Sequence, residues 1–391
     1  MKIKFAVIGC GHIGKRHAEM ISRHPEAELV ALCDTKPKSE LGIEKYDVPF
    51  FSSIEELLNS ERETRNEKRE TRNEKRETRN EKRETRSENP EPNTENRPPI
   101  TDHRLPITNL TEEIDVICIA SPNGLHATHA LKALEANKNV VIEKPMALTK
   151  ADCEKVIFTA LQKHKQVFCV MQNRYSPPSV WIKQMVESGK LGKIFMVQIN
   201  CYWNRDERYY TGKTWHGNKA LDGGTLFTQF SHFIDIMYWL FGDIKDIQAK
   251  FNDFNHQTLT DFEDSGFVNF NFVNGGMGSL NYSTSVWDKN LESSLTIIAE
   301  NGTIKIGGQY MNEVEYCHIK DYEMPKLLPA NPANDYGAYK GSAANHNYIF
   351  DNVVDVLKDR KKININPENG LKVVEMIEGI YTQKSKADII G

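Results

Sequence analysis

Short apolar runs alternate with segments of helical periodicity over the first 145 residues of the chain. Apolar runs rich in β-branched residues are typical of strands buried on both faces of a parallel sheet. They occupy residues 4–8, 28–33, 115–120 and 139–142. Apolar residues recur at helical spacing in residues 13–21 and 127–136. This alternation predicts an α/β unit with a doubly wound parallel sheet.

The pattern changes after Pro145. Helical periodicity is found in residues 150–163, 179–188, 349–357 and 371–381. Strand-like segments are residues 167–171, 193–202, 264–272, 278–283 and 295–299. Longer strands grouped in this way predict an α+β unit on a mostly antiparallel, open-faced sheet. We therefore expect two domains, residues 1–146 and residues 147–391.

One segment fits neither domain. From residue 62 to residue 89 the unit RETRNEK occurs three times and then once more as RETRSEN. A coiled coil needs apolar residues at two heptad positions, and this unit has none. Acidic residues nearly balance the basic ones and no aromatic residue interrupts them, which argues against a nucleic-acid-binding arm. We expect a solvated helix or a disordered insert, continued by an irregular linker over residues 89–106, within a surface-loop insertion of about residues 60–110.

Charge and cysteine content narrow the choice of partner. The chain has 50 basic and 54 acidic residues, a net charge of -4, so no overall field favours nucleic acid or an anionic membrane. No run of about 18 apolar residues is long enough to span a bilayer. The seven cysteines include no CxxC pair, which predicts reduced thiols, no zinc site and a cytoplasmic location. A small-molecule partner is expected.

Residues 9–14 read GCGHIG, which is GxGxxG between the first predicted strand and the first predicted helix. That context is the Rossmann fingerprint for a dinucleotide, in which the glycines allow a tight turn, close approach of the pyrophosphate and close packing. An aspartate twenty residues after the last glycine can bind the ribose hydroxyls and favours NAD over NADP. The alternative is a glycine turn of another α/β protein. The predicted cofactor residues are Gly9, Gly11, His12, Ile13, Gly14 and Asp34.

Two further motifs carry a family resemblance. The stretch DVICIASPNGLH over residues 115–126 and the stretch VVIEKP over residues 140–145 resemble the glucose-fructose oxidoreductase, inositol dehydrogenase and MocA family. The resemblance implies that both stretches border the cofactor and that the lysine of EKP reaches the reacting hydroxyl. From the residues alone, each of these side chains could instead cap a helix, fill the core or lie on the surface. The implied residues are Ser121, Asn123, His126, Glu143 and Lys144.

Residues 221–242 resemble the second catalytic motif of the same family, GG-x-L-x-D-x-G-x-H-x-x-D. The histidine is kept as His232, whereas Thr228 stands for the usual aspartate and Phe230 for the glycine. The Gln-x-Ser-His variant resembles the nucleotide-sugar branch, the UDP-N-acetyl-2-amino-2-deoxyglucuronate 3-dehydrogenases of the WlbA type. The likeness extends to residues 172–174, 192–203, 209–210 and 289–308.

The resemblance implies NAD-dependent oxidation of the 3-hydroxyl of a UDP-N-acetylglucosaminuronate-type sugar, in cell-surface polysaccharide biosynthesis. His232 would take the hydroxyl proton while Lys144 stabilises the oxygen, although the two roles could be exchanged because a desolvated lysine can act as a base. Arg174 is a candidate for an anionic group of the substrate and Gln229 for a sugar hydroxyl. A homodimer or homotetramer is implied as well.

Three other readings stay open. The enzyme could act on another sugar or on an inositol. The fold could serve as a non-catalytic NAD-binding sugar sensor, although both Lys144 and His232 are present. The charged repeat could make the chain a scaffold.

Overall fold

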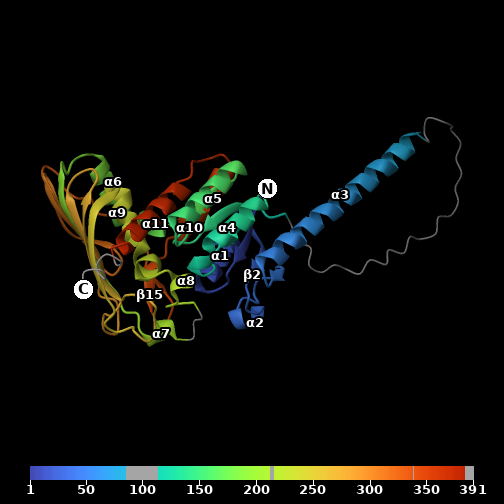
Figure 1. The fold of residues 1–391 in the computed structure, drawn as a ribbon. Coiled ribbons are helices and arrows are strands. Elements are labelled where there is room, and N and C mark those ends of the chain that lie inside the picture. Colours follow the sequence, from blue (N-terminus) through green and yellow to red (C-terminus); the bar gives the residue numbers. More distant parts are fainter. Residues whose placement is uncertain (85–112, 212–214, 338, 384–391) are drawn as a thin grey trace.

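A parallel sheet forms the first part of the computed structural model, which describes residues 1–84, 113–211, 215–337 and 339–383 (Figure 1). Its strand order is β3-β2-β1-β4-β5-β6, and every neighbouring pair is parallel. The strands are β1 (Ile3–Ile8), β2 (Ala27–Cys33), β3 (Phe50–Phe51), β4 (Val116–Ile119), β5 (Asn139–Ile142) and β6 (Val167–Cys169). The predicted doubly wound α/β fold is confirmed.

The last strand of this sheet comes from beyond the predicted domain boundary. The apolar run at residues 167–171 was grouped with the second domain, but β6 pairs in parallel with β5. Helix α5 (Lys150–Gln162) makes the crossover between the two strands, as parallel neighbours require. All three residues of β6 are buried, so the run is hydrophobic on both faces like the other parallel strands. The division at residue 146 stays a prediction, and the sheet continues past it.

Helices of both halves of the sequence cover this sheet. They are α1 (His12–Arg23), α4 (His126–Glu135), α5, α10 (His346–Leu357) and α11 (Pro367–Tyr381), whereas α2 (Lys38–Leu41) is a single turn after β2. Helix α10 packs against α1, and its Phe350 ring lies 6.0 Å from that of Phe5 in β1. Helix α11 contacts α5 and β6 on one side and β8 of the second sheet on the other. The end of the chain therefore ties the two sheets together.

The second sheet has seven strands in the order β13-β12-β11-β7-β10-β9-β8. They are β7 (Ile194–Tyr202), β8 (Ile244–Asn252), β9 (Ser265–Phe272), β10 (Met277–Ser283), β11 (Glu292–Ala299), β12 (Gly302–Gly307) and β13 (Glu313–Ile319). Only β7 and β10 pair in parallel, so the predicted mostly antiparallel sheet is confirmed. A short hairpin, β14 (Ala333–Asp335) with β15 (Lys340–Ala343), completes the strands.

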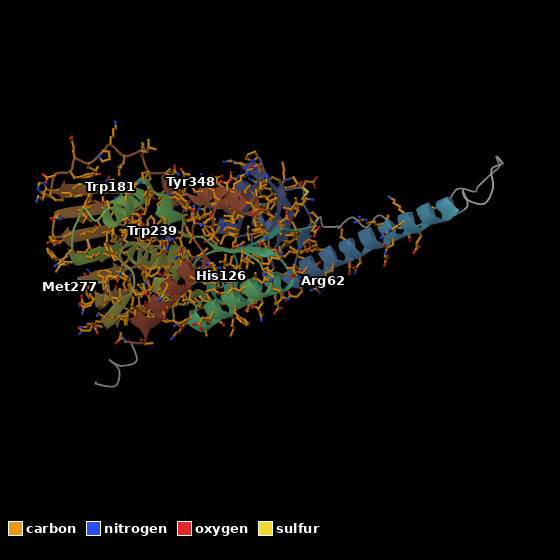
Figure 2. The ribbon with its side chains drawn as sticks, turned by 90° about the horizontal axis from the view of Figure 1, so that it is seen from above. Arg62, His126, Trp181, Trp239, Met277 and Tyr348 are labelled. Atoms are coloured by element: carbon orange, nitrogen blue, oxygen red, sulfur yellow. The ribbon has the colours of Figure 1, made fainter. Side chains whose placement is uncertain are left out.

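Burial alternates along the second sheet with a period of two residues. In β9 every second residue is buried while the residues between are exposed, as expected when one face packs and the other does not. The packed face meets α9 (Ser231–Phe241), whose Phe241 ring lies 5.3 Å from that of Phe272. The other face carries exposed apolar side chains, among them Met196, Phe267, Met277, Ile298 and Tyr316. Figure 2 shows Met277 at the outer side of this sheet, away from the parallel sheet.

The charged repeat continues a helix of the first unit. Helix α3 (Ile54–Glu84) starts against the parallel sheet and then projects away from the rest of the molecule (Figure 1). Figure 2 shows Arg62 where the helix leaves the body. The helix extends to Glu84 and the side chains of residues 70–78 are exposed, so the predicted solvated helix is confirmed for residues 70–78. The predicted linker over residues 89–106 lies outside the described residues.

The first turn of the predicted insertion is part of the core. Glu61 and Thr64 are buried. The Glu61 carboxylate forms a buried ion pair with Lys138 and accepts a hydrogen bond of 3.0 Å from the backbone N–H of Ile114. The projecting part of α3 therefore begins after Thr64. None of the helices in the described ranges combines the length and the apolar character that crossing a membrane requires.

Candidate functional site

The three glycines of the GxGxxG loop have different surroundings. Gly9 has a φ of +85°, and a Cβ there would lie 2.5 Å from the carbonyl oxygen of Ala120. A Cβ on Gly14 would lie 1.7 Å from the carbonyl oxygen of Gly9. Both positions require glycine for packing within the protein. A Cβ on Gly11 would meet no described atom within 4 Å, so open space faces the N-terminus of α1, where a pyrophosphate fits.

Asp34 follows β2 and orders the glycine loop. Its Oδ2 accepts a hydrogen bond of 2.6 Å from the backbone N–H of Cys10, and its Oδ1 accepts one of 2.9 Å from that of Lys36. Each carboxylate oxygen keeps a second lone pair, which can accept a further hydrogen bond from a ribose hydroxyl. Binding of the ribose by Asp34 stays a prediction. His12 is exposed at the start of α1 with its ring 5.3 Å from the ring of Tyr336, and Ile13 beside it is half-buried.

His126, in the segment after β4, connects the loop at Ser121 with the loop at Pro145. Both ring nitrogens of His126 lie against backbone carbonyl oxygens, Nδ1 at 2.7 Å from Pro145 and Nε2 at 2.8 Å from Ser121. Burial lowers the pKa of His126, although the two carbonyls oppose this effect. The hydroxyl of Ser121 lies 3.0 Å from Nδ1 of His129. His126 thus holds the two loops together, and its place at the cofactor stays a prediction.

Asn123 connects the first half of the site to the second. Its Nδ2 donates hydrogen bonds of 2.8 Å to the carbonyl oxygen of Asp222 and of 2.7 Å to the hydroxyl of Thr228. Ninety-nine residues separate Asn123 from Asp222 along the chain. The amide thus fixes the position of the second catalytic motif relative to the end of β4.

Lys144 contacts Thr228 of the same motif and is half-buried. Its Nζ donates a hydrogen bond of 2.6 Å to the carbonyl oxygen of Thr228. Burial lowers the pKa of Lys144 to about 8, while the charges of Glu143 and Asp222 act in the opposite direction. The lysine is therefore close to its midpoint near neutral pH, which is where a group that gives and takes a proton is most effective.

Glu143 is the buried neighbour of this lysine. Its Oε1 lies 2.8 Å from Nε2 of His17 and 3.7 Å from Nε2 of His346. Burial raises the pKa of Glu143, but the hydrogen bond and charge of His17 outweigh it and lower the value to about 2. The carboxylate therefore stays ionised beside Lys144.

Glu143, His17 and His346 are of residue types that bind zinc, and their ligand atoms lie within 4.8 Å of one another. They come from α1, the end of β5 and α10, so no spacing in the sequence could show the set. His17 already gives the carboxylate of Glu143 a hydrogen-bond partner at 2.8 Å. Hydride transfer to a nicotinamide needs no metal.

His232 lies in the first turn of α9, directly after a π-helical turn over η3 (Leu226–Phe230). Such turns within helices are frequent at functional sites. Its Nε2 lies 3.3 Å from Nε2 of Gln172, and its Nδ1 is buried without a hydrogen-bond partner among the described residues. Burial, and then the charge of Lys144, lowers the pKa of His232 well below its usual value. The histidine is therefore neutral at pH 7 and has one ring nitrogen for a ligand.

Asp222 is a member of the site that the sequence did not single out. Its carboxylate accepts a hydrogen bond of 2.9 Å from the backbone N–H of Gly217 and another from the hydroxyl of Thr228. Burial raises the pKa of Asp222 to about 6, against the opposing effects of Thr228, Gly217 and Lys144. The only signal in the sequence is its position directly before the glycine pair at residues 223–224.

The structure argues against the role predicted for Arg174. Its guanidinium makes two hydrogen bonds with the carboxylate of Asp235, of 2.8 and 2.6 Å, and a third of 3.2 Å with Asn369. Asp235 neutralises its charge, and both are buried. The carboxylate of Asp235 thus occupies the pair of parallel N–H donors with which a substrate anion would be bound. Gln229 is also engaged, because its Oε1 accepts from Arg205 at 2.7 Å and its Nε2 donates to the hydroxyl of Tyr209 at 2.9 Å.

Comparison with known families and proteins agrees with this fold. A model described as "Oxidoreductase family, NAD-binding Rossmann fold" matches residues 3–65 and 76–171. The model "GFO/IDH/MocA C-terminal domain" matches residues 180–305. Both units seen in the structure are thus recognised, and residues 66–75 of the projecting helix fall between the two matched segments.

Curated relatives match parts of the chain. An uncharacterized oxidoreductase of Synechocystis sp. is 26% identical over 216 residues, which are 53% of this chain and 57% of that protein. The inositol 2-dehydrogenase of Salmonella typhimurium is 32% identical over 142 residues, 36% of this chain and 39% of that enzyme. The matches therefore span about two fifths to three fifths of these relatives' length.

Solved structures match the whole chain. The WlbA dehydrogenase of Bordetella pertussis, in complex with NADH and UDP-GlcNAcA, is 26% identical with a TM-score of 0.76, and the match covers 99% of this chain and 98% of that one. Levoglucosan dehydrogenase, in complex with NADH, is 18% identical with a TM-score of 0.70, covering 99% and 98%. The second likeness concerns the fold alone.

Proposed function

Because the chain belongs to the GFO/IDH/MocA family of oxidoreductases, with an NAD-binding Rossmann fold, we propose that it oxidises a sugar hydroxyl by hydride transfer to NAD. The proposed substrate is a nucleotide sugar of the UDP-N-acetylglucosaminuronate type, oxidised at its 3-hydroxyl for cell-surface polysaccharide biosynthesis. Support comes from the full-length likeness to a dehydrogenase in complex with NADH and UDP-GlcNAcA. It also comes from the Gln-x-Ser-His stretch that ends at His232.

One observation carries the catalytic part of the proposal. Lys144 is half-buried, has a pKa of about 8 and donates a hydrogen bond to the carbonyl oxygen of Thr228. His232 was first expected to be the base, with Lys144 as the alternative. The pKa of His232 lies well below its usual value, which makes it a weak base at neutral pH, so the pKa order favours Lys144.

The proposed reaction breaks a C–H and an O–H bond of the sugar and forms a carbonyl. Bound NAD⁺ supplies the acceptor for the hydride. Neutral Lys144 takes the hydroxyl proton, and Nδ1 of His232 hydrogen-bonds the sugar. The ionised carboxylate of Glu143 then stabilises the positive charge on Lys144. The glycine loop and Asp34 hold the dinucleotide.

We further propose a cytoplasmic homodimer or homotetramer. The seven cysteines are free thiols, as a reducing compartment maintains them. The outer face of the second sheet exposes the apolar residues Met196, Phe267, Met277 and Ile298 along neighbouring strands. A patch of this kind on a sheet is typical of a protein–protein contact.

The test is to incubate the purified protein and NAD with UDP-N-acetylglucosaminuronate, UDP-N-acetylglucosamine and myo-inositol in turn. NADH absorbance reports oxidation, and mass spectrometry identifies any 3-keto product. Oxidation of the uronate alone supports the proposal. Oxidation of myo-inositol alone would transfer the assignment to the inositol dehydrogenases, in line with the 32% identity to that enzyme. NADH binding without oxidation of any of the three would favour the sensor reading.

Lys144→Ala should abolish turnover while NADH still binds, because the lysine acts on the hydroxyl proton and not on the glycine loop. The matched control is Lys155→Ala, an exposed lysine on α5 that forms an ion pair with Asp152. Retained turnover in Lys144→Ala would remove the lysine from the mechanism.

A further inference from the structure

Arg205, in the loop after β7, is buried without a neutralising carboxylate in the part of the chain that the structure describes. Its side chain is only 2% exposed. All of its hydrogen-bond acceptors are neutral: Oε1 of Gln229 at 2.7 Å, the carbonyl of Asn204 at 2.6 Å, Oδ1 of Asn290 at 3.2 Å and the carbonyl of Lys340 at 3.1 Å. A guanidinium has five N–H donors, and these contacts use four of them. They fix the plane of the group and leave one N–H on Nη2 without an acceptor among the described residues.

Aromatic rings form the rest of its surroundings. The guanidinium carbon lies 4.7 Å from the ring centre of Trp203, 5.1 Å from that of Tyr209 and 5.0 Å from that of Tyr339. Cation–π contacts attract the guanidinium to the ring faces, but a ring carries no net charge and cannot neutralise a cation that has been removed from water. The rings and the neutral acceptors hold the guanidinium in place but leave its full positive charge in the interior.

Arg174 shows what a structural arginine in the same protein looks like. It is buried to a similar extent, and the carboxylate of Asp235 neutralises it through two hydrogen bonds. Arg205 has the same burial without that partner. Because an uncompensated buried charge is destabilising, it is retained where a ligand supplies the counter-charge.

Two sets of contacts place Arg205 beside the reacting groups. Gln229, which accepts from the arginine, is the direct neighbour of Thr228, whose carbonyl holds Lys144. On the other side, the ring of Tyr339 lies 5.0 Å from that of Tyr336, which in turn lies 5.3 Å from the ring of His12 in the glycine loop. Both tyrosines are half-buried, so a ligand can approach from their side.

We propose that Arg205 is the binding site for a carboxylate carried on the sugar ring of the substrate. This assignment rests on the proposed dehydrogenase function and makes Arg205 a specificity-determining residue for sugar acids over neutral sugars. The remaining N–H of Nη2 donates to the carboxylate, and the fixed guanidinium supplies the charge. A carboxylate on the ring is favoured over a diphosphate because Gln229, which binds Arg205, directly follows Thr228, which binds Lys144. The anion and the reacting hydroxyl therefore belong to the same ring.

Equilibrium binding to the NADH-loaded protein tests this directly. UDP-N-acetylglucosaminuronate and UDP-N-acetylglucosamine differ only in a carboxylate against a hydroxymethyl group, so the ratio of their dissociation constants isolates the carboxylate. The wild-type protein should prefer the uronate by roughly 30-fold or more, as expected for a buried charge pair. Arg205→Met should remove that preference. Arg208→Met is the matched control, because this nearby arginine is exposed and paired with Asp206.

The outcomes separate this inference from the proposed function. A preference that survives Arg205→Met overturns it, and so does an equal loss of affinity for both ligands, which would point to the shared diphosphate. If Arg205→Met does not fold, the wild-type protein gives the answer with the 6-amide of the uronate. The amide should bind no better than UDP-N-acetylglucosamine, and an amide that binds as tightly as the acid overturns the inference. Failure of all these sugars to bind or react would count against the proposed function instead.

Discussion

The pKa of Lys144 leads to a specific pH dependence of sugar oxidation. Burial lowers this pKa to about 8, and the proposed mechanism requires the neutral amine. The rate constant kcat/KM for oxidation should therefore rise with pH along one ionisation near pH 8 and then level off. Glu143, with a pKa of about 2, stays ionised throughout and adds no inflection above pH 6.

The size of the effect follows from the titration of one group. With a pKa of about 8, roughly 1% of Lys144 is neutral at pH 6 and about half at pH 8. We expect kcat/KM to increase about 50-fold between these two values and less than about twofold above pH 8. The shift from 10.5 to about 8 corresponds to about 3 kcal/mol of unfavourable burial of the charged form.

The same shift affects stability. Between pH 8 and 10.5 the unfolded chain holds a proton on Lys144 that the folded protein has lost, so stability should rise with pH in this window. At pH 7 both states are protonated and the folded state bears the full cost. Lys144→Met should therefore abolish turnover and raise the free energy of unfolding at pH 7. Loss of the hydrogen bond to Thr228 reduces this gain in stability by about 1 kcal/mol.

Initial rates of NADH formation at constant ionic strength, from pH 6 to pH 9.5, provide the assay. Asp222→Asn removes a charge that raises the pKa of Lys144, so its inflection should move to lower pH. A profile that falls above pH 8 would refute the reasoning, because it would show that the charged lysine is required and that His232 is the base. A profile without an inflection between pH 7 and 9 would remove Lys144 from the proton transfer altogether.

Three other predictions concern the framework of the site. Gly11→Ala should weaken NADH binding without a change in melting temperature, whereas Gly14→Ala should prevent folding because its Cβ would lie 1.7 Å from a carbonyl oxygen; calorimetry and circular dichroism distinguish them. Arg174→Met should destabilise the protein by roughly 3–5 kcal/mol in denaturant unfolding by leaving Asp235 unpaired, and a changed KM with unchanged stability would contradict this. Replacing residues 68–109 by a short Gly/Ser linker should leave melting temperature and turnover unchanged; loss of either would support a role for the repeat.

The cofactor half of the fold could be predicted from the sequence because its signals are local. The glycines at positions 9, 11 and 14 are read from six consecutive residues, and each strand of the parallel sheet is a continuous apolar run. The run that forms β6 was recognised as a strand but grouped with the wrong sheet. Its partner β5 lies on the other side of a helix, so only the pairing in space decides which sheet it joins.

The roles of the two buried arginines could not be predicted from their neighbours in the sequence. Arg174 lies in a stretch that resembles the family, yet its role depends on Asp235, which is 61 residues away and binds it through both carboxylate oxygens. Arg205 belongs to no motif, and its importance comes from the absence of a carboxylate among the described residues around it. Spacing along a chain shows which charges are present, but it does not show which of them are neutralised.

The departure from the family pattern at Thr228 has a structural explanation. The family motif places an aspartate there, so its loss would leave the catalytic lysine with one fewer carboxylate nearby. In this chain the hydroxyl of Thr228 binds the carboxylate of Asp222, and the carbonyl of the same threonine binds Lys144. Asn123 holds this hydroxyl from the other half of the site. A carboxylate six residues earlier is thereby placed close enough to oppose the fall in the pKa of the lysine, so the motif has changed while a negative charge beside the lysine has been retained.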